Sequence, residues 1–171
     1  MKKIVYIIPG MGQSCALLQY KQLAEDFYAK GYEVRTIDPD WYKPLSMQIF
    51  KVPKNAVIFG FSMGAVLAYL VAKKYPCKKL ILASIAPTHT FHQKEFEQFL
   101  STHMEKELAT KITKDIRKIR VSLKTLSTPS VTFMGELEPM TRGELVPDHL
   151  IPKTTHRITK KYREVIMKAV S

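Results

Sequence analysis

Residues 56–72 hold a Gly-x-Ser-x-Gly motif between two apolar runs, and this stretch limits the fold more strongly than any other. The run before the motif is rich in β-branched and aromatic residues, which is typical of a buried strand. The run after the motif is longer and rich in Ala and Leu, which is typical of a buried helix. The sequence therefore predicts a strand that turns sharply into a helix at Ser62.

The two glycines of the motif, Gly60 and Gly64, fit the crowding that such a turn produces. A side chain at either position would clash with the backbone on the other side of the bend. The turn would expose the Ser62 hydroxyl at the N-terminus of the following helix, where backbone N–H groups stabilise negative charge. We therefore interpret Ser62 as a nucleophile; the alternative is a strand–helix turn in which Ser62 only caps the helix.

Short apolar runs alternate with amphipathic segments along the whole chain. Buried strands that are joined by helical crossovers form parallel sheets covered on both faces. We predict one domain over residues 1–171, a three-layer α/β/α sandwich with a mostly parallel central sheet and a small helical insert at residues 85–128. The expected strands cover residues 4–8, 33–37, 56–60, 79–84, 130–134 and 149–151, and the expected helices cover 17–30, 64–74, 91–126 and 160–170.

The loops that follow parallel strands lie along one edge of the sheet, where active sites gather. Four such loops carry residues of chemical interest: 9–12, 60–64, 135–140 and 154–156. A serine hydroxyl needs a base within hydrogen-bond reach, usually a histidine that a carboxylate orients. We therefore look for the base and the acid in the last two loops.

His156 is the candidate base, because it lies in the loop before the final helix. His149 lies within an expected strand and is interpreted as a core or edge residue. The preceding loop contains two glutamates. We favour Glu138, which follows Gly135 by three residues and precedes a proline that stiffens the turn, and we keep Glu136 as the alternative acid. The order along the chain is then serine, carboxylate, histidine.

With these motifs the chain resembles a small α/β-hydrolase over nearly its full length, from the first strand and its loop at residues 4–12 to the histidine at 155–156. The resemblance implies a minimal α/β-hydrolase fold with little or no cap. It also implies a catalytic triad of Ser62, Glu138 and His156. The acid is a glutamate here, whereas aspartate is commoner in the family.

The resemblance further implies an oxyanion hole made of two backbone N–H groups. One belongs to Met63, which follows the nucleophile, and the other to Met11, in the loop after the first strand. That loop begins with Pro9-Gly10 where the family usually has His-Gly, a change that keeps the backbone donors.

Both the residues and the resemblance point to a serine hydrolase that cleaves carboxylic esters or thioesters through an acyl-enzyme intermediate. Gly10, Gly12 and Met140 are expected to contact this small-molecule substrate. We expect no cofactor and no metal. The two cysteines, Cys15 and Cys77, have neither a metal-ligand spacing nor a disulfide pattern, and we expect free thiols in a cytoplasmic protein.

The net charge of +12 attracts anionic partners, although a lysine-rich solvated surface explains it equally simply. No zinc-finger spacing, RNP pattern or Arg-rich arm is present, so no nucleic-acid partner is expected. An acidic carrier protein or an anionic membrane surface remain as candidate contacts. The alternative function is an inactive hydrolase-fold binding module that uses this basic surface, and the sequence does not predict an oligomeric state.

Overall fold

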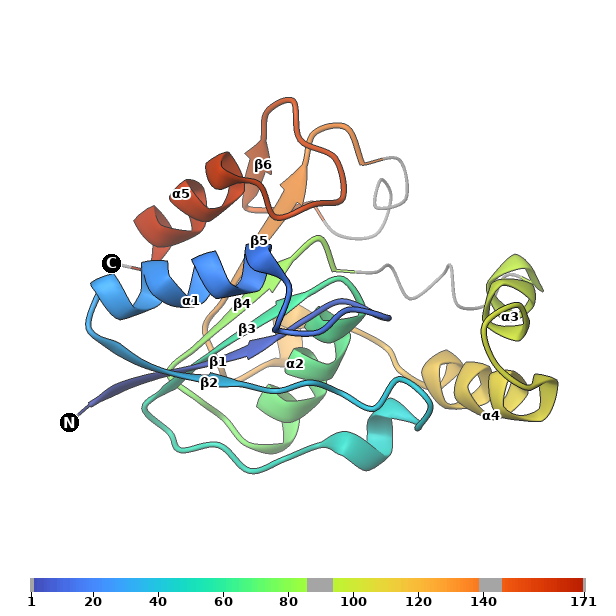
Figure 1. Cartoon of the computed structure of the whole chain (residues 1–171). Helices are drawn as coiled ribbons and strands as arrows, with labels where there is room; N and C mark the ends of the chain where they lie inside the picture. Colours follow the sequence, from blue (N-terminus) through green and yellow to red (C-terminus); the bar gives the residue numbers. More distant parts are fainter. Residues whose placement is uncertain (1, 86–93, 139–145, 171) are drawn as a thin grey trace.

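A computed structural model describes residues 2–85, 94–138 and 146–170 of the chain (Figure 1). Within these residues the strands form one 6-stranded sheet in the order β2-β1-β3-β4-β5-β6, and every pairing is parallel. The strands are β1 (Lys3–Ile8), β2 (Tyr32–Thr36), β3 (Ala56–Phe61), β4 (Lys79–Ala83), β5 (Ser130–Gly135) and β6 (His149–Ile151). The helices are α1 (Leu18–Ala29), α2 (Met63–Lys74), α3 (Lys94–Ser101), α4 (Lys106–Arg117) and α5 (Lys160–Ala169), with short 3-10 turns η1 (Leu45–Gln48) and η3 (Leu123–Thr125).

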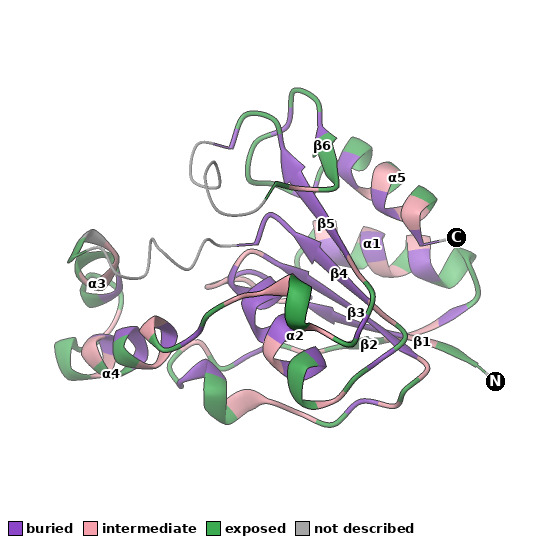
Figure 2. Ribbon diagram, turned by 180° about the vertical axis from the view of Figure 1, so that it is seen from behind, coloured by how far each residue is buried: buried purple, intermediate pink, exposed green. Residues whose placement is uncertain are grey.

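The predicted three-layer α/β/α sandwich is confirmed, because helices cover both faces of this sheet (Figure 1). Helices α1 and α5 pack on one face and α2 packs on the other. Successive residues of β1 alternate between the two layers, with Val5 and Ile7 facing α1 and α5 and with Tyr6 and Ile8 facing α2. Figure 2 shows the central strands as buried along their length, which explains their nearly continuous apolar sequences.

The order of the strands places the reversal of the sheet between β1 and β3. Starting from β1, the chain adds β2 on one side and then β3, β4, β5 and β6 on the other. The loops after β1 and β3 therefore leave the sheet side by side at this switch point, where open α/β sheets bind their ligands.

The sequence predicts a helical pattern over residues 91–126, with room for two or three helices, in the segment between β4 and β5. Its described part consists of two helices, α3 and α4, and the turn η3. The helical run breaks after α3, where the Thr102 hydroxyl donates a hydrogen bond to the Phe99 carbonyl. Such local side-chain bonds compete with the backbone bonds of a continuing helix. Helix α4 then packs beside η1, where Ser46 N donates to Asp115 at 3.2 Å.

No helix among the described residues combines the length and the apolar character that crossing a membrane requires.

Candidate active site

Ser62 lies at the sharp turn between β3 and α2 that the sequence predicts. Its φ of 54° is in the left-handed region, which a residue with a Cβ atom rarely adopts. A Cβ atom on Gly60 would lie 2.5 Å from the Gly64 carbonyl oxygen, so only glycine fits there. The turn is anchored by the Ser62 N–H, which donates to the Ala83 carbonyl of β4 at 2.9 Å.

Gly64 brings the loop after β1 against this turn. A Cβ atom at Gly64 would lie 2.1 Å from the Pro9 carbonyl oxygen and 2.6 Å from the Ile8 carbonyl oxygen. Glycine therefore lets the first turn of α2 approach the end of β1 more closely than any other residue could. A Cβ atom on Gly10 would be 3.4 Å from the Cβ atom of Ser62, so the loop reaches the serine itself.

The loop after β1 is a tight turn that leaves the Met11 N–H available. Gln13 N donates to the Gly10 carbonyl at 3.0 Å, and Gly12 has a φ of 71°. Gly10 N donates to the hydroxyl of the buried Tyr20, whose pKa is raised by burial, so that the hydroxyl stays protonated and donates to Gln13 Oε1. Within the described part of the chain, the Met11 N–H has no acceptor.

Met63 supplies a second backbone N–H at the same place. It is the first residue of α2, and the N–H groups of a first helical turn have no acceptor within their own helix. The N–H groups of Met11 and Met63 thus belong to the two segments that Gly64 holds together. Such a pair of donors suits an oxyanion hole.

Glu138 is buried, with 2 % of its surface exposed, although a carboxylate normally stays in water. Three donors replace that water. Oε1 accepts from Gly135 N at 2.7 Å and from the Ser84 hydroxyl at 2.6 Å, and Oε2 lies 2.8 Å from His156 Nδ1. A Cβ atom on Gly135 would lie 2.7 Å from Oε1 and 2.3 Å from the Thr154 carbonyl oxygen, so glycine makes room for this arrangement.

His156 faces both Glu138 and the neighbour of Ser62. Its imidazole lies 4.8 Å from the Phe61 ring, centroid to centroid, and 46 % of its side chain is exposed. Because Nδ1 is engaged by Glu138, Nε2 is the nitrogen left for a reacting group. Among the described residues no hydrogen bond to the Ser62 hydroxyl is found, and catalytic bonds of this kind often form only with substrate bound.

Glu136, the alternative acid, and His149, the other histidine considered, make different contacts from Glu138 and His156. Glu136 Oε2 accepts from Lys153 N at 2.9 Å, and Lys153 precedes the histidine loop. His149 is exposed on β6 and stacks on Phe133 with 4.9 Å between ring centroids. Met140, which the sequence places at the substrate, lies outside the described residues.

Sequence reasoning missed two buried hydroxyls beside the acid, those of Ser84 and Tyr162. Ser84 Oγ contacts Glu138 Oε1, and the Tyr162 hydroxyl lies 2.8 Å from Ser84 Oγ. Ser84 could have been found, because it directly follows β4 and so lies at the same sheet edge as the other candidates. Nothing in the sequence distinguishes Tyr162 from an ordinary core residue of an amphipathic helix.

The described residues include no cluster of metal-ligating side chains, and their two cysteines are buried. The described residues contain no group of three or more His, Cys, Asp or Glu side chains that could hold a metal ion. Cys15 and Cys77 are free and buried, as expected. Burial and the nearby Asp38 carboxylate raise the pKa of Cys15 to about 12, so it remains a neutral thiol at physiological pH.

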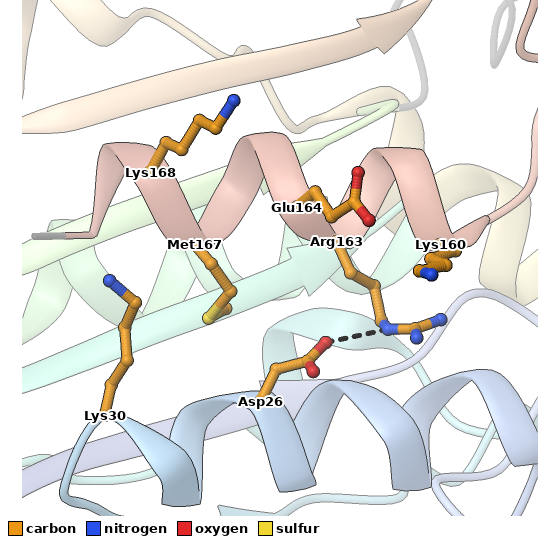
Figure 3. A pocket seen from close by; sticks show the side chains of 7 residues that line it. All are labelled: Asp26, Lys30, Lys160, Arg163, Glu164, Met167 and Lys168. Atoms are coloured by element: carbon orange, nitrogen blue, oxygen red, sulfur yellow. Dashed lines mark hydrogen bonds and ion pairs between the residues drawn. The ribbon is translucent and has the colours of Figure 1, made fainter.

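Two surface grooves are lined by basic residues, and neither is lined by Ser62, Glu138 or His156. The larger, of about 460 Å³, lies between α1 and α5, where Arg163 reaches across to Asp26 at 2.8 Å (Figure 3). Lys30, Lys160 and Lys168 also line this groove, together with Glu164. The smaller, of about 340 Å³, lies where α2 meets the end of α4. Basic side chains therefore line a groove on each of the two helical layers.

No protein-family model and no curated protein sequence matches the chain. Solved structures do. The chain is similar to MGS-MChE2, an α/β hydrolase from the metagenome of lagoon sediments at Mar Chica, Morocco, with a TM-score of 0.72 and 18 % identity, covering 99 % of this chain and 89 % of that one. Est1E from Butyrivibrio proteoclasticus has a TM-score of 0.70 and 16 % identity to this chain, and the match covers 98 % of this chain and 84 % of that one. ClbQ from the colibactin pathway has a TM-score of 0.65 and 16 % identity to this chain, and the match covers 99 % of this chain and 95 % of that one.

These likenesses extend over nearly all of this chain and most of each neighbour, at identities too low to establish more than the fold. They agree with the six-stranded parallel sheet that helices cover on both faces. This chain is a small protein of the α/β-hydrolase fold.

Proposed function

We propose that the protein is a serine hydrolase that cleaves carboxylic esters or thioesters, with Ser62 as nucleophile, His156 as general base and Glu138 as the acid. The observation that carries the proposal is the 2.8 Å hydrogen bond between His156 Nδ1 and the buried carboxylate of Glu138. The imidazole also packs on Phe61, the residue directly before Ser62. Ser62 itself is partly exposed. A histidine that a carboxylate orients near an accessible serine is the arrangement that activates a hydroxyl.

In the first half of the reaction, Ser62 Oγ attacks the carbonyl carbon while His156 Nε2 takes the hydroxyl proton. The Met11 and Met63 N–H groups stabilise the oxyanion, and losing one such donor typically lowers the rate about 10²–10³-fold. The tetrahedral intermediate then collapses. The bond to the leaving oxygen or sulfur breaks, His156 gives its proton to that atom, and an alcohol or thiol departs from the acyl-enzyme.

In the second half, a water molecule attacks the acyl carbonyl and His156 takes one of its protons. Collapse breaks the bond to Ser62 Oγ, and His156 returns the proton to the serine. The sum is one ester or thioester and one water converted to a carboxylic acid and an alcohol or thiol. Glu138 keeps its charge throughout, fixes the ring with Nε2 toward the serine and stabilises the imidazolium.

One of the similar structures is named an esterase from a marine microorganism, and another, RedJ from Streptomyces coelicolor, is named a thioesterase, which supports this substrate class. We propose the segment 85–128 as a small insert in the position where larger relatives carry a cap, and Gly10, Gly12 and Met140 as substrate contacts. A lightly covered site suits small or loosely held acyl groups. With a net charge of +12, an acidic carrier protein is a candidate donor of the acyl group.

A fluorescent fluorophosphonate tests the proposal without knowledge of the natural substrate, because an activated serine attacks its phosphorus, displaces fluoride and keeps the phosphonyl group. Wild type should be labelled rapidly, whereas Ser62→Ala and His156→Ala should not be labelled. Ser101→Ala is the matched control, since Ser101 lies on the exposed surface of α3. Folded wild type that stays unlabelled, or labelling that survives in Ser62→Ala, would contradict the proposal.

The second candidate, a binding module without turnover, is favoured by the basic groove between α1 and α5. It predicts an unlabelled Ser62 together with binding of an acidic partner that weakens as salt is added. Replacing Lys160 and Lys168 by Gln would weaken that binding, and it would leave fluorophosphonate labelling unchanged if the first proposal is right.

A further inference from the structure

Two buried hydroxyl groups join the acid of the site to two other elements of the fold. Ser84 directly follows β4, Tyr162 lies on α5, and both residues are 0 % exposed. Ser84 Oγ is 2.6 Å from Glu138 Oε1 and 2.8 Å from the Tyr162 hydroxyl. Residues far apart in the sequence thus form one chain of hydrogen bonds that ends at Glu138 Oε1.

Counting protons gives the direction of this chain of hydrogen bonds. An ionised carboxylate only accepts, so the single hydroxyl proton of Ser84 is donated to Glu138 Oε1. Ser84 Oγ has no second proton for Tyr162, so the Tyr162 hydroxyl is the donor between those two. Burial, together with the charge of Glu138, raises the pKa of Tyr162 and keeps it protonated for this role. Tyr162 therefore donates to Ser84, and Ser84 donates to Glu138.

The backbone of Ser84 is strained, so holding its hydroxyl beside Glu138 costs free energy of folding. Its φ of 47° lies in the left-handed region, which costs a residue with a side chain of the order of 1 kcal/mol. Ser84 N donates to the Phe133 carbonyl of β5 at 2.7 Å, which fixes the residue beside the strand that leads to the acid. A hydroxyl held in a strained conformation and aimed at a catalytic carboxylate fits a functional role.

The identity of the acid explains why such an anchor is needed. Glutamate has one more rotatable bond than aspartate, so its carboxylate has more conformations to lose when it is held toward a histidine. Gly135 N and Ser84 Oγ both hold Oε1, which leaves Oε2 directed at His156 Nδ1. The Tyr162 hydroxyl in turn fixes the rotamer of Ser84.

We propose that Ser84 and Tyr162 are positioning residues for Glu138, which hold its carboxylate in the conformation that orients His156. This inference rests on the proposed function, and it assigns neither residue a contact with substrate. It predicts that removing the hydroxyl of Tyr162 slows the chemical step through Glu138 alone.

The decisive variant is Tyr162→Phe, which deletes only the hydroxyl. Tyr69→Phe is the matched control, because Tyr69 is also buried and its hydroxyl also makes two hydrogen bonds, accepting from Ser122 N and donating to the Arg120 carbonyl. The fluorophosphonate labelling rate and kcat on a p-nitrophenyl ester should fall about 5-fold in Tyr162→Phe, with KM unchanged. Ser84→Ala should lower both about 10–100-fold, because it removes a bond to a charged group. Tyr69→Phe should keep the wild-type rates.

A double-mutant cycle separates positioning from a merely structural role. In a Glu138→Ala background, Tyr162→Phe should change the labelling rate less than about 2-fold, because the residue through which it acts is gone. An equal loss in both backgrounds, or no loss in wild type that labels normally, would overturn the inference and leave the proposed function intact.

If folded wild type is not labelled, the proposed function fails, and the hydrogen-bond chain is then tested on the resting protein. The ring signals of His156 in a nuclear magnetic resonance spectrum should shift in Tyr162→Phe and stay in place in Tyr69→Phe. Unchanged His156 signals in Tyr162→Phe would overturn the inference by this route as well.

Discussion

The two halves of the site are built by different physical means. The elbow half, made of β1, β3, the loop at residues 9–13 and the start of α2, is held by close backbone packing at Gly60 and Gly64, where only glycine fits. The acid–base half, made of residues 135–138 and 151–156 with Ser84 and Tyr162, is held by side-chain hydrogen bonds between distant segments. Replacing the close-packed glycines of the first half should therefore affect folding most, whereas replacing the hydrogen-bonded side chains of the second half should affect catalysis most.

The largest expected effect lies in the acid–base half. His156→Ala removes the general base and should lower kcat at least about 10³-fold. Because the imidazole is 46 % exposed but is one of the three donors to the buried Glu138 carboxylate, the free energy of unfolding should fall by about 1–3 kcal/mol. Urea denaturation and steady-state kinetics measure the two quantities. His149→Ala, another exposed histidine that stacks on an aromatic ring, is the control and should keep its activity; the opposite pattern would exchange the roles of the two histidines.

The elbow half should show the reverse behaviour. Gly64→Ala puts a methyl group within 2.1 Å of the Pro9 carbonyl oxygen and should destabilise the protein by about 3 kcal/mol or more. Gly12→Ala is the matched control, because a Cβ atom there meets nothing within 4 Å and only the φ of 71° is unfavourable. Gly12→Ala should lower the free energy of unfolding by about 1 kcal/mol. Equal urea midpoints for the two variants would show that close packing does not control the elbow half.

The contrast between the halves also explains which parts of the molecule could be predicted from the sequence. The strand, turn and helix around Ser62 follow from local patterns, since Gly60 and Gly64 are needed within a few residues of the bend. The alternation of strands and helices likewise gave the layered fold. Each of these features depends on neighbours in the sequence, so the sequence displays them directly.

The acid–base half was only partly predictable, because its contacts join residues far apart in the chain. Glu138 and Glu136 have nearly the same local sequence context, and only the tertiary structure separates a buried carboxylate beside His156 from one that binds Lys153 N. Tyr162 has the spacing of an ordinary core residue on α5. The position of the break between α3 and α4 was not predicted, because the apolar spacing continues through it and the bond from Thr102 to the Phe99 carbonyl does not show in a periodic pattern.

A subtler change tests whether the reach of the acid matters. Glu138→Asp shortens the side chain by one methylene, so the carboxylate cannot contact Gly135 N, Ser84 and His156 together. We expect kcat to fall about 10–100-fold, a loss comparable to that of one hydrogen bond to a charged group. Glu136→Asp should leave kcat unchanged in the same assay. A loss in Glu136→Asp alone would identify Glu136 as the acid.

The smallest expected effect concerns Cys15, which packs beside the end of β1 and donates to the Ile7 carbonyl. Its pKa is raised from 9.0 to about 12, so between these values the unfolded chain loses the thiol proton and the folded chain keeps it. Its contribution to stability is complete below pH 9 and decreases as the pH rises toward 12. Between pH 8 and pH 10 the free energy of unfolding of wild type should fall by up to about 1 kcal/mol more than that of Cys15→Ala. Parallel pH profiles of the two proteins in urea denaturation would contradict this.

The most direct test of the account is to trap the acyl-enzyme. Wild type mixed with p-nitrophenyl acetate and quenched in acid within the first turnover should carry one acetyl group on the peptide that contains Ser62, as measured by mass spectrometry. Ser62→Ala and His156→Ala should carry none. Hydrolysis of the ester without an adduct on Ser62, or an adduct that persists at the wild-type level in His156→Ala, would contradict the roles assigned to these residues.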